Sequence, residues 1–445
     1  MSILISLLAR SPKTSNNEQD SSQQYILTPC QQRALEVLNG DSNVFLTGEA
    51  GTGKSYLLGQ FLEGKGTKRY PVVASTGAAA ILVGGRTFHS FFGLGILEGG
   101  VESTISRALR SRKLIDRLIQ ADCVVIDEVS MLSGTVLETA ERIARKARDN
   151  DAPWGGLRII AVGDFAQLPP VDDSVSGKEW GFLHDVWQRS QFIPILLKTV
   201  VRTHDMEYLK LLQSIRNGDV NSDVEEYMNS KVINNTDDFE GTRLYPHRAS
   251  VDAYNLKKLD ELKGKLWEFT TAYTGKESYI DILRKKAPIP EKILLKKGAL
   301  IMIRKNDTSH KEPQMIYVNG SLGHVHRISE DTLEIDLLTG RRIKLSKQSF
   351  DMLNGDGDVI AQAYNFPVNL SWASTIHKAQ GATIDRVLVQ LQSLWEPGQA
   401  YVALSRTRSG DNLFLESWSA GSIIVEPMVQ QFYERLAQET VQTTE

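Results

Sequence analysis

The glycine-rich stretch "GEAGTGKS", Gly48 to Ser55, has the residue types and the spacing of a phosphate-binding loop. Its glycines leave backbone N–H groups open to a polyphosphate that side chains would block. Lys54 would reach the β- and γ-phosphates, and Ser55 would offer its hydroxyl to the accompanying Mg²⁺. A flexible turn is the alternative, but the flanking runs "NVFLT" and "SYLLGQFL" have strand and helix patterns. We therefore predict nucleotide contacts from Gly48, Gly51, Thr52, Gly53, Lys54 and Ser55.

An acidic pair follows another apolar run, in "CVVIDEVSM". Asp127 and Glu128 would be costly at a buried strand end without a cation, and the Mg²⁺ of the nucleotide supplies one. We expect Asp127 to hold that metal through water and Glu128 to polarise the attacking water; an acidic helix N-cap is the alternative. Gln167, in "GDFAQLPPV", has an amide that can orient water or sense the γ-phosphate. Gln31, in "LTPCQQRAL", is placed to bind an adenine edge.

The elements that must position these residues form an α/β pattern. From Cys30 to about Val200, short apolar strands that end in polar or small residues alternate with helical segments. In such folds ligand sites collect at the carboxyl ends of the strands. A second α/β region begins at about Val201. Within it, residues 297–365 change to short alternating segments separated by turns, which predicts a small antiparallel barrel or sheet.

Composition limits the possible classes of protein. A chain of 445 residues exceeds one comfortable core, so we expect two large lobes. Two cysteines are too few for a disulfide framework. The net charge of −3 gives no overall basic footprint, so a nucleic-acid partner would need a local cationic groove. No apolar run approaches the roughly 20 residues that span a bilayer, which predicts a soluble protein without membrane partners.

Taken in order, the motifs resemble the Pif/RecD-type branch of superfamily-one DNA helicases, the petite integration frequency family. The resemblance covers about residues 26 to 418 and is carried by "LTPCQQRAL", "GEAGTGKS", "ASTGAAA", "GGRTFHSFFGLG", "VIDEVSM", "GDFAQLPPV", "FPVNLSWASTIHKAQGATID" and "GQAYVALSRTR". The segment "LETAERIARKARDNDAPWGGLRII" also resembles the stretch that distinguishes the Pif members, with Trp154 where Phe is usual. The resemblance implies two RecA-like lobes that close on ATP, a nucleic-acid strand across their top and 5′-to-3′ translocation.

On this basis we predict an α/β fold of two RecA-like parallel-sheet lobes with a small β-barrel insert in the second lobe. The expected limits are 25–200 for the first lobe, with a wedge insert at about 93–120, then 201–296 and 366–435 for the second lobe, and 297–365 for the inserted barrel. Residues 1–24 are expected to be a disordered polar tail, with a transit peptide as the alternative, and 436–445 a C-terminal tail.

Two groups of polar residues suit a strand held by its phosphates and stacked bases rather than read by sequence. One lies in "ASTGAAA" and "TFHSFFG", the other in "WASTIHKAQGAT", for which a solvated helix start is the alternative. We expect at least two of Phe88, Phe91 and Phe92 to be core residues instead. The predicted DNA-binding residues are Ser75, Thr76, His89, Thr375, His377, Lys378 and Gln380, while Gly381 is assigned to the nucleotide.

Two arginines of the second region are candidates for γ-phosphate contacts. Arg202 lies in "VVRTHD" and Arg406 in "VALSRTR". A guanidinium that one lobe delivers to a phosphate held by the other makes hydrolysis depend on closure. For a lone arginine, a surface ion pair is the commoner arrangement. Thr203 stands where the family usually has Gln, which weakens the assignment of Arg202 relative to Arg406.

These features predict an ATP-dependent 5′-to-3′ DNA helicase that uses Mg²⁺ and acts on single-stranded, forked or tailed DNA in replication, repair or recombination. The alternatives are an RNA or RNA–DNA hybrid helicase, a nucleotide-dependent binding switch without unwinding, and a small-molecule phosphotransferase. We expect a monomer that can multimerise on DNA. Its location would be the cytoplasm, with the nucleoid, in a prokaryote or virus, and the nucleus or mitochondrion in a eukaryote.

Overall fold

The computed structural model describes residues 27–75, 86–95, 100–170, 179–203, 205–237, 239–305, 316–317, 321–338, 340–353, 359–384 and 386–442. The predicted tail 1–24 therefore lies outside the described residues, as does Thr76.

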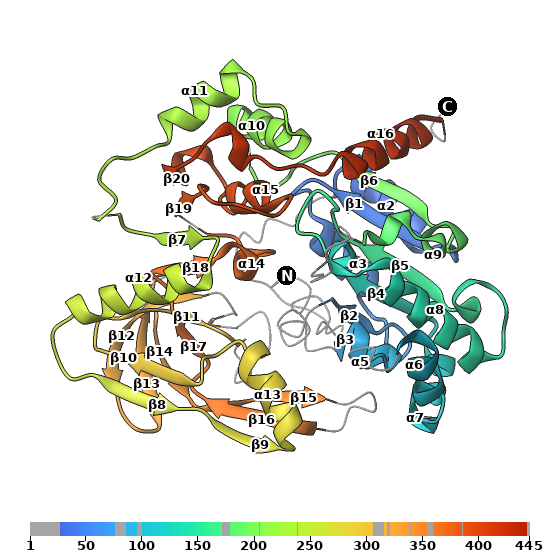
Figure 1. Ribbon diagram of the computed structural model, residues 1–445, viewed down its shortest axis with the longest axis horizontal. Helices are drawn as coiled ribbons and strands as arrows, with labels where there is room; N and C mark the ends of the chain where they lie inside the picture. Colours follow the sequence, from blue (N-terminus) through green and yellow to red (C-terminus); the bar gives the residue numbers. More distant parts are fainter. Residues whose placement is uncertain are drawn as a thin grey trace, which may run out of the picture.

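The first lobe is a six-stranded parallel sheet with strand order β3-β2-β4-β5-β1-β6 (Figure 1). Its strands are β1 (Val44–Gly48), β2 (Val72–Ala74), β3 (Arg86–Thr87), β4 (Cys123–Asp127), β5 (Arg158–Val162) and β6 (Ile193–Leu197). The apolar runs of β1 and β4 are buried along their whole length, as expected of parallel strands covered on both faces. The accompanying helices are α2 (Pro29–Leu38), α3 (Lys54–Leu62), α5 (Phe88–Phe92), α6 (Gly100–Ala108), α7 (Arg112–Gln120), α8 (Gly134–Arg148) and α9 (Asp185–Arg189), with 3-10 turns η1 (Val129–Met131), η2 (Pro153–Gly156) and η3 (Gly181–Leu183).

The second lobe has a four-stranded parallel sheet with strand order β18-β7-β19-β20. Its strands are β7 (Thr242–Tyr245), β18 (Ala373–Thr375), β19 (Val387–Gln390) and β20 (Leu413–Ser417). Its helices are α10 (Met206–Asn217), α11 (Ser222–Ser230), α12 (Arg248–Glu261), α14 (Ile376–Ala379) and α15 (Gln399–Leu404), with η4 (Gly410–Asn412) and η5 (Ala420–Ser422). Two parallel α/β lobes are thus confirmed.

Between β7 and β18 the chain forms an antiparallel region, at the lower left of Figure 1. Its largest sheet has the order β14-β13-β12-β11-β17, from β11 (Leu300–Ile303), β12 (Leu322–Ile328), β13 (Thr332–Leu337), β14 (Arg342–Ser346) and β17 (Val368–Leu370). Smaller sheets join β15 (Gln348–Leu353), β16 (Val359–Asn365) and β9 (Ala272–Gly275), and β8 (Trp267–Thr270) and β10 (Lys292–Leu295), beside α13 (Glu277–Lys286). Alternating burial along β13 and β14 is typical of sheets with one face in a core.

The antiparallel strands expected within residues 297–365 are therefore present, but closure of these strands into a barrel is not confirmed. Among the described strands the largest sheet ends at β14 on one side and at β17 on the other. Strands β8, β9 and β10 lie before residue 297 in the chain and also belong to this region. The predicted limits of the insert stay a prediction.

The last helix, α16 (Pro427–Gln442), returns to the first lobe after the chain has completed the second. Figure 1 shows it beside β6, on the side of the first lobe. Val429, Tyr433 and Leu436 are buried in the same apolar core as strands β1 and β4. Phe432 stacks on Phe182 with ring centroids 4.5 Å apart. The first lobe therefore contains residues from both ends of the chain.

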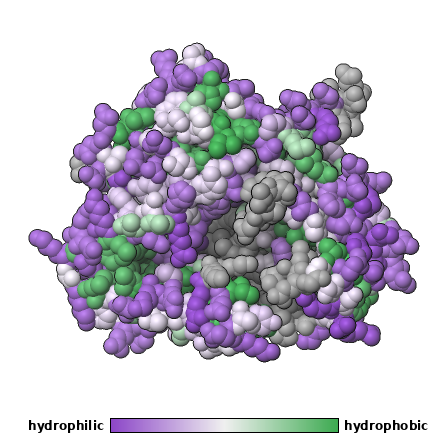
Figure 2. Space-filling model, viewed as in Figure 1, coloured by the Kyte–Doolittle hydropathy of each residue, from purple (hydrophilic) through white to green (hydrophobic). Residues whose placement is uncertain are grey.

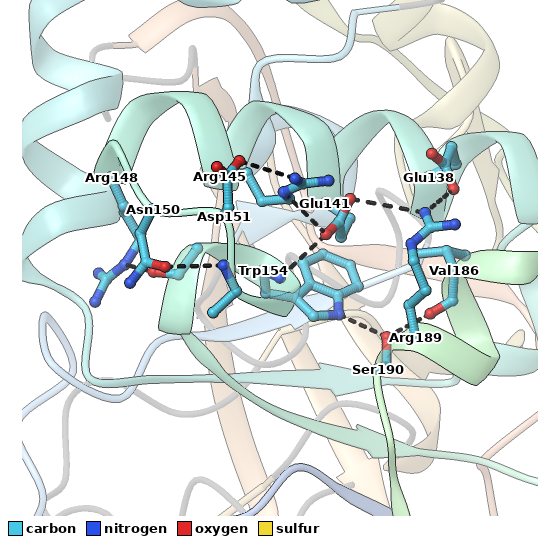
Figure 3. Close-up of polar contacts among 12 residues, drawn as sticks. Glu138, Glu141, Arg145, Arg148, Asn150, Asp151, Trp154, Val186, Arg189 and Ser190 are labelled. Atoms are coloured by element: carbon cyan, nitrogen blue, oxygen red, sulfur yellow. Dashed lines mark hydrogen bonds and ion pairs between the residues drawn. The ribbon is translucent and has the colours of Figure 1, made fainter.

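A polar network joins α8 to η2, within the segment that resembles the Pif-specific stretch (Figure 3). The backbone N–H of Trp154 donates to Glu141 Oε1 at 3.3 Å, and its indole N–H donates to Ser190 Oγ at 2.7 Å. Gly155, with φ of 66°, has no room for a side chain, because a Cβ there would lie 2.7 Å from Ala144 O. Trp154 is thus fully buried beside α8 while both of its N–H groups keep a hydrogen-bond partner.

The helix α5 packs on this network. Phe88, Phe91 and Phe92 are all buried, which confirms the expectation that at least two of them are core residues. The ring centroid of Phe92 lies 5.8 Å from that of Trp154. The helices α6 and α7, within the predicted wedge segment 93–120, also pack against α8.

No helix in the described part of the chain is long and apolar enough to cross a membrane. Figure 2 shows a mainly hydrophilic surface on this face, with hydrophobic patches that are separate from one another.

We predict that Trp154→Phe lowers the free energy of unfolding by about 1–3 kcal/mol, because it removes a buried hydrogen bond and leaves a void. Urea unfolding followed by circular dichroism measures this loss. Trp418→Phe is the matched control: Trp418 is only half-buried and its hydrogen bond to Asn229 is exposed, so its loss of stability should be clearly smaller than that of Trp154→Phe. Equal losses for the two variants would contradict the prediction.

Candidate nucleotide site and strand-contact residues

The phosphate-binding loop connects the end of β1 to the start of α3. Gly48, Gly51 and Gly53 have φ values of 151°, 86° and 85°, in the region that favours glycine. Space is also lacking: a Cβ on Gly48 would lie 2.5 Å from Leu197 O, and one on Gly51 would lie 2.7 Å from Cβ of Arg202. Both conformation and packing therefore require the bare backbone that the sequence indicates.

The side chains of this loop bond back onto its own backbone. Lys54 Nζ donates to the carbonyl oxygens of Gly48 at 2.7 Å and Glu49 at 3.1 Å. Burial lowers the pKa of Lys54, while acidic neighbours act to keep it charged. Thr52 is buried and its hydroxyl donates to Glu49 O at 2.9 Å. Ser55 is half-buried in the first turn of α3, where its hydroxyl suits a metal held against the loop.

Residues outside the loop fix its shape. Gly51 O accepts the backbone N–H groups of Val201 at 2.9 Å and Arg202 at 3.1 Å. The backbone N–H of Ala50 donates to the hydroxyl of Tyr401, in α15 of the second lobe, at 2.8 Å. The segment after β6 and the second lobe therefore both contact the phosphate-binding loop.

Gln31 lies beside the loop, as its predicted adenine contact requires. Its side-chain oxygen accepts the backbone N–H of Thr28 at 3.0 Å and completes the capping box of α2. Its amide nitrogen donates to Thr52 O at 3.1 Å. A Cβ on Gly53 would lie only 2.6 Å from this amide nitrogen. Gln31 thus joins α2 to the phosphate-binding loop, and its contact with adenine stays a prediction.

Asp127 and Glu128 end strand β4, as predicted. Asp127 is buried, and Glu128 has the left-handed φ of 54°. Burial raises the pKa of Asp127. Burial and then the neighbouring Asp127 raise the pKa of Glu128 to about 7. A carboxyl group that titrates near neutral pH is suited to accept a proton from water.

The described residues contain no group of three or more His, Cys, Asp and Glu side chains that could hold a metal ion. The predicted Mg²⁺ site needs no such group, because Mg²⁺ is usually bound by one or two carboxylates together with phosphates and water. A carboxylate at the end of β4 and a hydroxyl at the start of α3 supply the oxygen donors that Mg²⁺ prefers. Asp127 and Ser55 therefore fit the ion.

Gln380 reaches from the second lobe to the acidic pair. Its amide nitrogen donates to Glu128 Oε2 at 3.2 Å and to Gln167 Oε1 at 3.4 Å. Gln380 is the C-cap residue of α14. In this structure its amide lies at the acidic pair, and its predicted contact with DNA stays a prediction. Gln167 is buried beyond β5, and its predicted role in orienting water or sensing the γ-phosphate stays a prediction.

The two predicted arginines lie next to each other. Arg202 Nη1 donates to the backbone oxygen of Ser405 at 3.3 Å, one residue before Arg406. Arg406 is buried, and its guanidinium donates to three backbone oxygens of its own lobe and to the Ser405 hydroxyl. Burial and then Arg202 lower the pKa of Arg406 to about 10, while Glu128 opposes that shift. Arg406 therefore stays charged at neutral pH.

The predicted strand-contact residues lie in both lobes. Ser75 follows β2 and His89 is in the first turn of α5, and both are half-buried. Thr375 caps α14, where its hydroxyl accepts the backbone N–H of Lys378 at 3.3 Å. Lys378 is exposed. These residues have side chains that can contact phosphates, and their contacts with DNA stay a prediction.

His377 belongs to a ring stack on the second lobe. Its Nε2 lies 3.0 Å from Oε2 of Glu396. The ring of Trp395, which is half-exposed, has its centroid 6.3 Å from that of His377 and 4.6 Å from that of His247, nearly parallel to the latter. Aromatic rings on a strand path suit stacking of bases.

Several residues at the nucleotide site were missed by sequence reasoning. Tyr401 and Asp164 lie inside quoted motifs, "GQAYVALSRTR" and "GDFAQLPPV", so their place in a motif was an available signal. Glu49 lies in the loop itself. Arg216 lies in the amphipathic helix α10 and forms an ion pair with Asp164 at 3.0 Å, and nothing in its local sequence indicates this contact.

Two parallel α/β lobes, a phosphate-binding loop in the first that Tyr401 of the second contacts, and a second-lobe glutamine that reaches Glu128 define a two-lobed P-loop nucleoside triphosphatase with RecA-like lobes. Comparison with known proteins narrows this class.

A family model described as "PIF1-like helicase" matches residues 18–226. The ATP-dependent DNA helicase Pif1 of Bdellovibrio bacteriovorus is 45% identical over 409 residues, which cover 92% of each protein. That of Xenopus laevis is 34% identical, over 91% of this chain and 63% of its own length. The crystal structure of the Candida albicans Pif1 helicase matches 93% of this chain and all of its own, with a TM-score of 0.80 and 30% identity. The chain belongs to the PIF1-like helicase family.

We predict that Gln380→Ala slows ATP hydrolysis by about tenfold or more, because it removes a hydrogen bond to a charged carboxylate. Affinity for single-stranded DNA should stay within about twofold of wild type. Phosphate release measures the first quantity and fluorescence anisotropy with a labelled oligonucleotide measures the second. Lys378→Ala is the comparison variant, in which DNA affinity should fall instead. Weakened DNA binding with normal hydrolysis in Gln380→Ala would support the original assignment to DNA.

Proposed function

We propose that this protein is an ATP-dependent 5′-to-3′ DNA helicase. The observation that carries the proposal is the bridge between the lobes at the hydrolysis site, where Gln380 of the second lobe contacts Glu128 and Gln167 of the first. A site assembled from both lobes is completed only when they are together. Movement between the lobes and hydrolysis are therefore linked, which is the requirement for a motor.

The nucleotide is held by residues of known position. The loop amides and Lys54 bind the phosphates, and Gln31 binds the adenine edge. Ser55 and Asp127 would hold Mg²⁺, which would neutralise phosphate charge at this site. Glu128 accepts a proton from the attacking water, and its raised pKa suits this role near pH 7. Gln167 orients that water through its amide.

The second lobe supplies cationic groups. Arg406 is buried beside Glu128, and Arg202 contacts both the segment of Arg406 and the phosphate-binding loop. In hydrolysis their guanidinium groups stabilise the charge that develops on the transferred phosphoryl group. Closure of the lobes then brings these groups to the phosphate, and opening withdraws them.

The proposed substrate is a single DNA strand that crosses both lobes, leading to a forked or tailed duplex. Ser75, Thr76 and His89 of the first lobe and Thr375, His377 and Lys378 of the second would hold its phosphates and bases. Pif1 of Bacteroides, 28% identical, has been solved in complex with ADP-AlF4 and bound to single-stranded DNA. A further Pif1 structure, also 28% identical, concerns unwinding at forked double-stranded DNA by two coordinating Pif1 helicases. By analogy we propose a monomer that can multimerise on DNA.

A DNA-bound motor works where its substrate is. We place it in the nucleoid within the cytoplasm if the source is a prokaryote or virus, and in the nucleus or mitochondrion if the source is a eukaryote. The proposed roles are in replication, repair or recombination.

The proposal is tested by unwinding of otherwise identical duplexes with a 5′ or a 3′ single-stranded tail. We expect strand displacement from the 5′-tailed duplex only, with ATP and Mg²⁺ present. Lys54→Ala should abolish both ATP hydrolysis and unwinding but retain binding to single-stranded DNA, because the strand-contact residues lie elsewhere. Equal displacement of the 3′-tailed duplex would refute the polarity, and normal unwinding by Lys54→Ala would refute the proposed nucleotide site.

We predict that Arg406→Ala lowers DNA-stimulated turnover by about 10³-fold or more, which is the range for arginine fingers. Arg406→Lys should restore little, because an ammonium group cannot reproduce the planar fork. Nucleotide affinity, measured with a fluorescent analogue, should stay close to wild type in both variants, because the loop and Gln31 supply most of the ground-state contacts. Turnover within about tenfold of wild type, about 1.4 kcal/mol, would show that Arg406 is no arginine finger.

A further inference from the structure

The turn of residues 164–167 follows β5 of the first lobe and carries Gln167 at the nucleotide site. It begins at Asp164, which is fully buried, and ends at Gln167, whose side chain contacts Gln380. Asp164 Oδ1 accepts the backbone N–H of Ala166 at 3.1 Å, so the carboxylate shapes the turn that presents Gln167. A buried carboxylate requires further partners.

The first of these partners comes from the second lobe. Arg216, near the end of α10, donates through Nη2 to Asp164 Oδ1 at 3.0 Å. Both side chains are almost completely buried. Burial acts to raise the pKa of Asp164, but Arg216 and Lys54 outweigh it and hold that pKa below its usual range. The ion pair therefore ties the turn to the second lobe in its charged form.

The second partner comes from α16, at the end of the described chain. The hydroxyl of Tyr433 donates to Asp164 Oδ1 at 2.9 Å and accepts the backbone N–H of Phe165 at 2.9 Å. The hydroxyl of Thr47 is also 2.9 Å away, and because the single Tyr433 proton goes to Asp164, Thr47 is the donor. Thr47 lies one residue before the phosphate-binding loop. The Tyr433 hydroxyl therefore contacts the 164–167 turn, the Asp164 carboxylate of the ion pair, and the residue just before the phosphate-binding loop.

Arg216 and Tyr433 also contact each other. The guanidinium carbon of Arg216 lies 4.2 Å from the centroid of the Tyr433 ring. Burial raises the pKa of Tyr433 well above its usual value, so the hydroxyl keeps the proton that it donates. The arginine and the tyrosine thus form one unit around the carboxylate of Asp164.

Backbone contact supports the turn from another side. Gly398, the residue before α15, has φ of 78°. A Cβ on it would lie 2.3 Å from Gln167 O and 2.7 Å from Ala166 O. The start of α15 is therefore pressed directly against the turn. Three separate elements that follow the first-lobe sheet in the chain, α10, α15 and α16, contact these four residues.

We propose that Arg216 and Tyr433 are positioning residues for ATP hydrolysis, which fix the 164–167 turn so that Gln167 meets Glu128 and Gln380 when the lobes are together. This inference rests on the proposed ATPase function and adds two residues that no motif of the sequence assigned. When α10 moves with the second lobe, the distance between Arg216 and Asp164 changes. Because Asp164 shapes the turn, the position of Gln167 changes with it. The last helix is accordingly part of the hydrolysis machinery.

The test is Tyr433→Phe, which keeps the ring and removes the hydroxyl. We expect DNA-stimulated kcat to fall by about tenfold, as for loss of one hydrogen bond to a charged group, with KM for ATP within about twofold. Arg216→Lys keeps the charge but loses the planar fork, and should give the same split between kcat and KM. Because the two residues act on one carboxylate, the double variant should be less impaired than the product of the single effects.

Leu436→Ala is the matched control, since Leu436 is buried in the same core on the same helix. It should lower the melting temperature at least as much as Tyr433→Phe, with kcat close to wild type. Unchanged kcat in Tyr433→Phe, or an equal loss of kcat in Leu436→Ala, would overturn the inference and leave α16 a purely structural helix. Absence of DNA-stimulated hydrolysis in the wild-type chain would instead refute the proposed function.

Discussion

The whole site depends on holding a glycine-rich loop in one shape. Glycines admit a polyphosphate, but they also leave the backbone free to move, so its shape must be imposed by hydrogen bonds from outside. Gly51 is held by the chain after β6, Ala50 by Tyr401, and the Gly53 side of the loop by Gln31. The second lobe therefore contacts the phosphate-binding loop directly, through Tyr401 as well as through Gln380 at the acidic pair. Part of what holds the loop in shape thus comes from the other lobe.

Much of the fold and site could be predicted from local sequence. Buried parallel strands are recognised in the sequence as apolar runs that end in polar residues. The carboxyl ends of such strands lie together at one edge of the sheet. Glu128 and Gln167 were both selected because they follow predicted strands, and Gln380 lies within hydrogen-bond distance of both. The phosphate-binding loop has a fixed spacing, because its geometry is set within eight residues. Motif order then indicated the family, to which the chain belongs.

The remainder depended on contacts between distant residues. Gln380 was grouped with its sequence neighbours as a DNA contact, and its hydrogen bond to Glu128, 252 residues away, could not be read from the local sequence. Arg216 looks like an ordinary exposed helix residue until α10 is placed against Asp164, 52 residues away. Nor does periodicity show which sheet a helix covers: α16 follows the second lobe in sequence and packs on the first. Strand closure in the antiparallel region is equally non-local.

The place of α16 also has a consequence for how the protein is made. Ribosomes deliver the first lobe early, yet its aromatic surface at Phe165, Phe182 and Trp187 is covered by Phe432, which is synthesised some 240 residues after Trp187. Until α16 emerges, a nascent first lobe presents that apolar surface to its surroundings and lacks the tyrosine beneath its nucleotide loop. A chain interrupted after the second lobe would therefore keep this apolar surface exposed and would lack the Tyr433 hydroxyl that contacts Thr47 and Asp164.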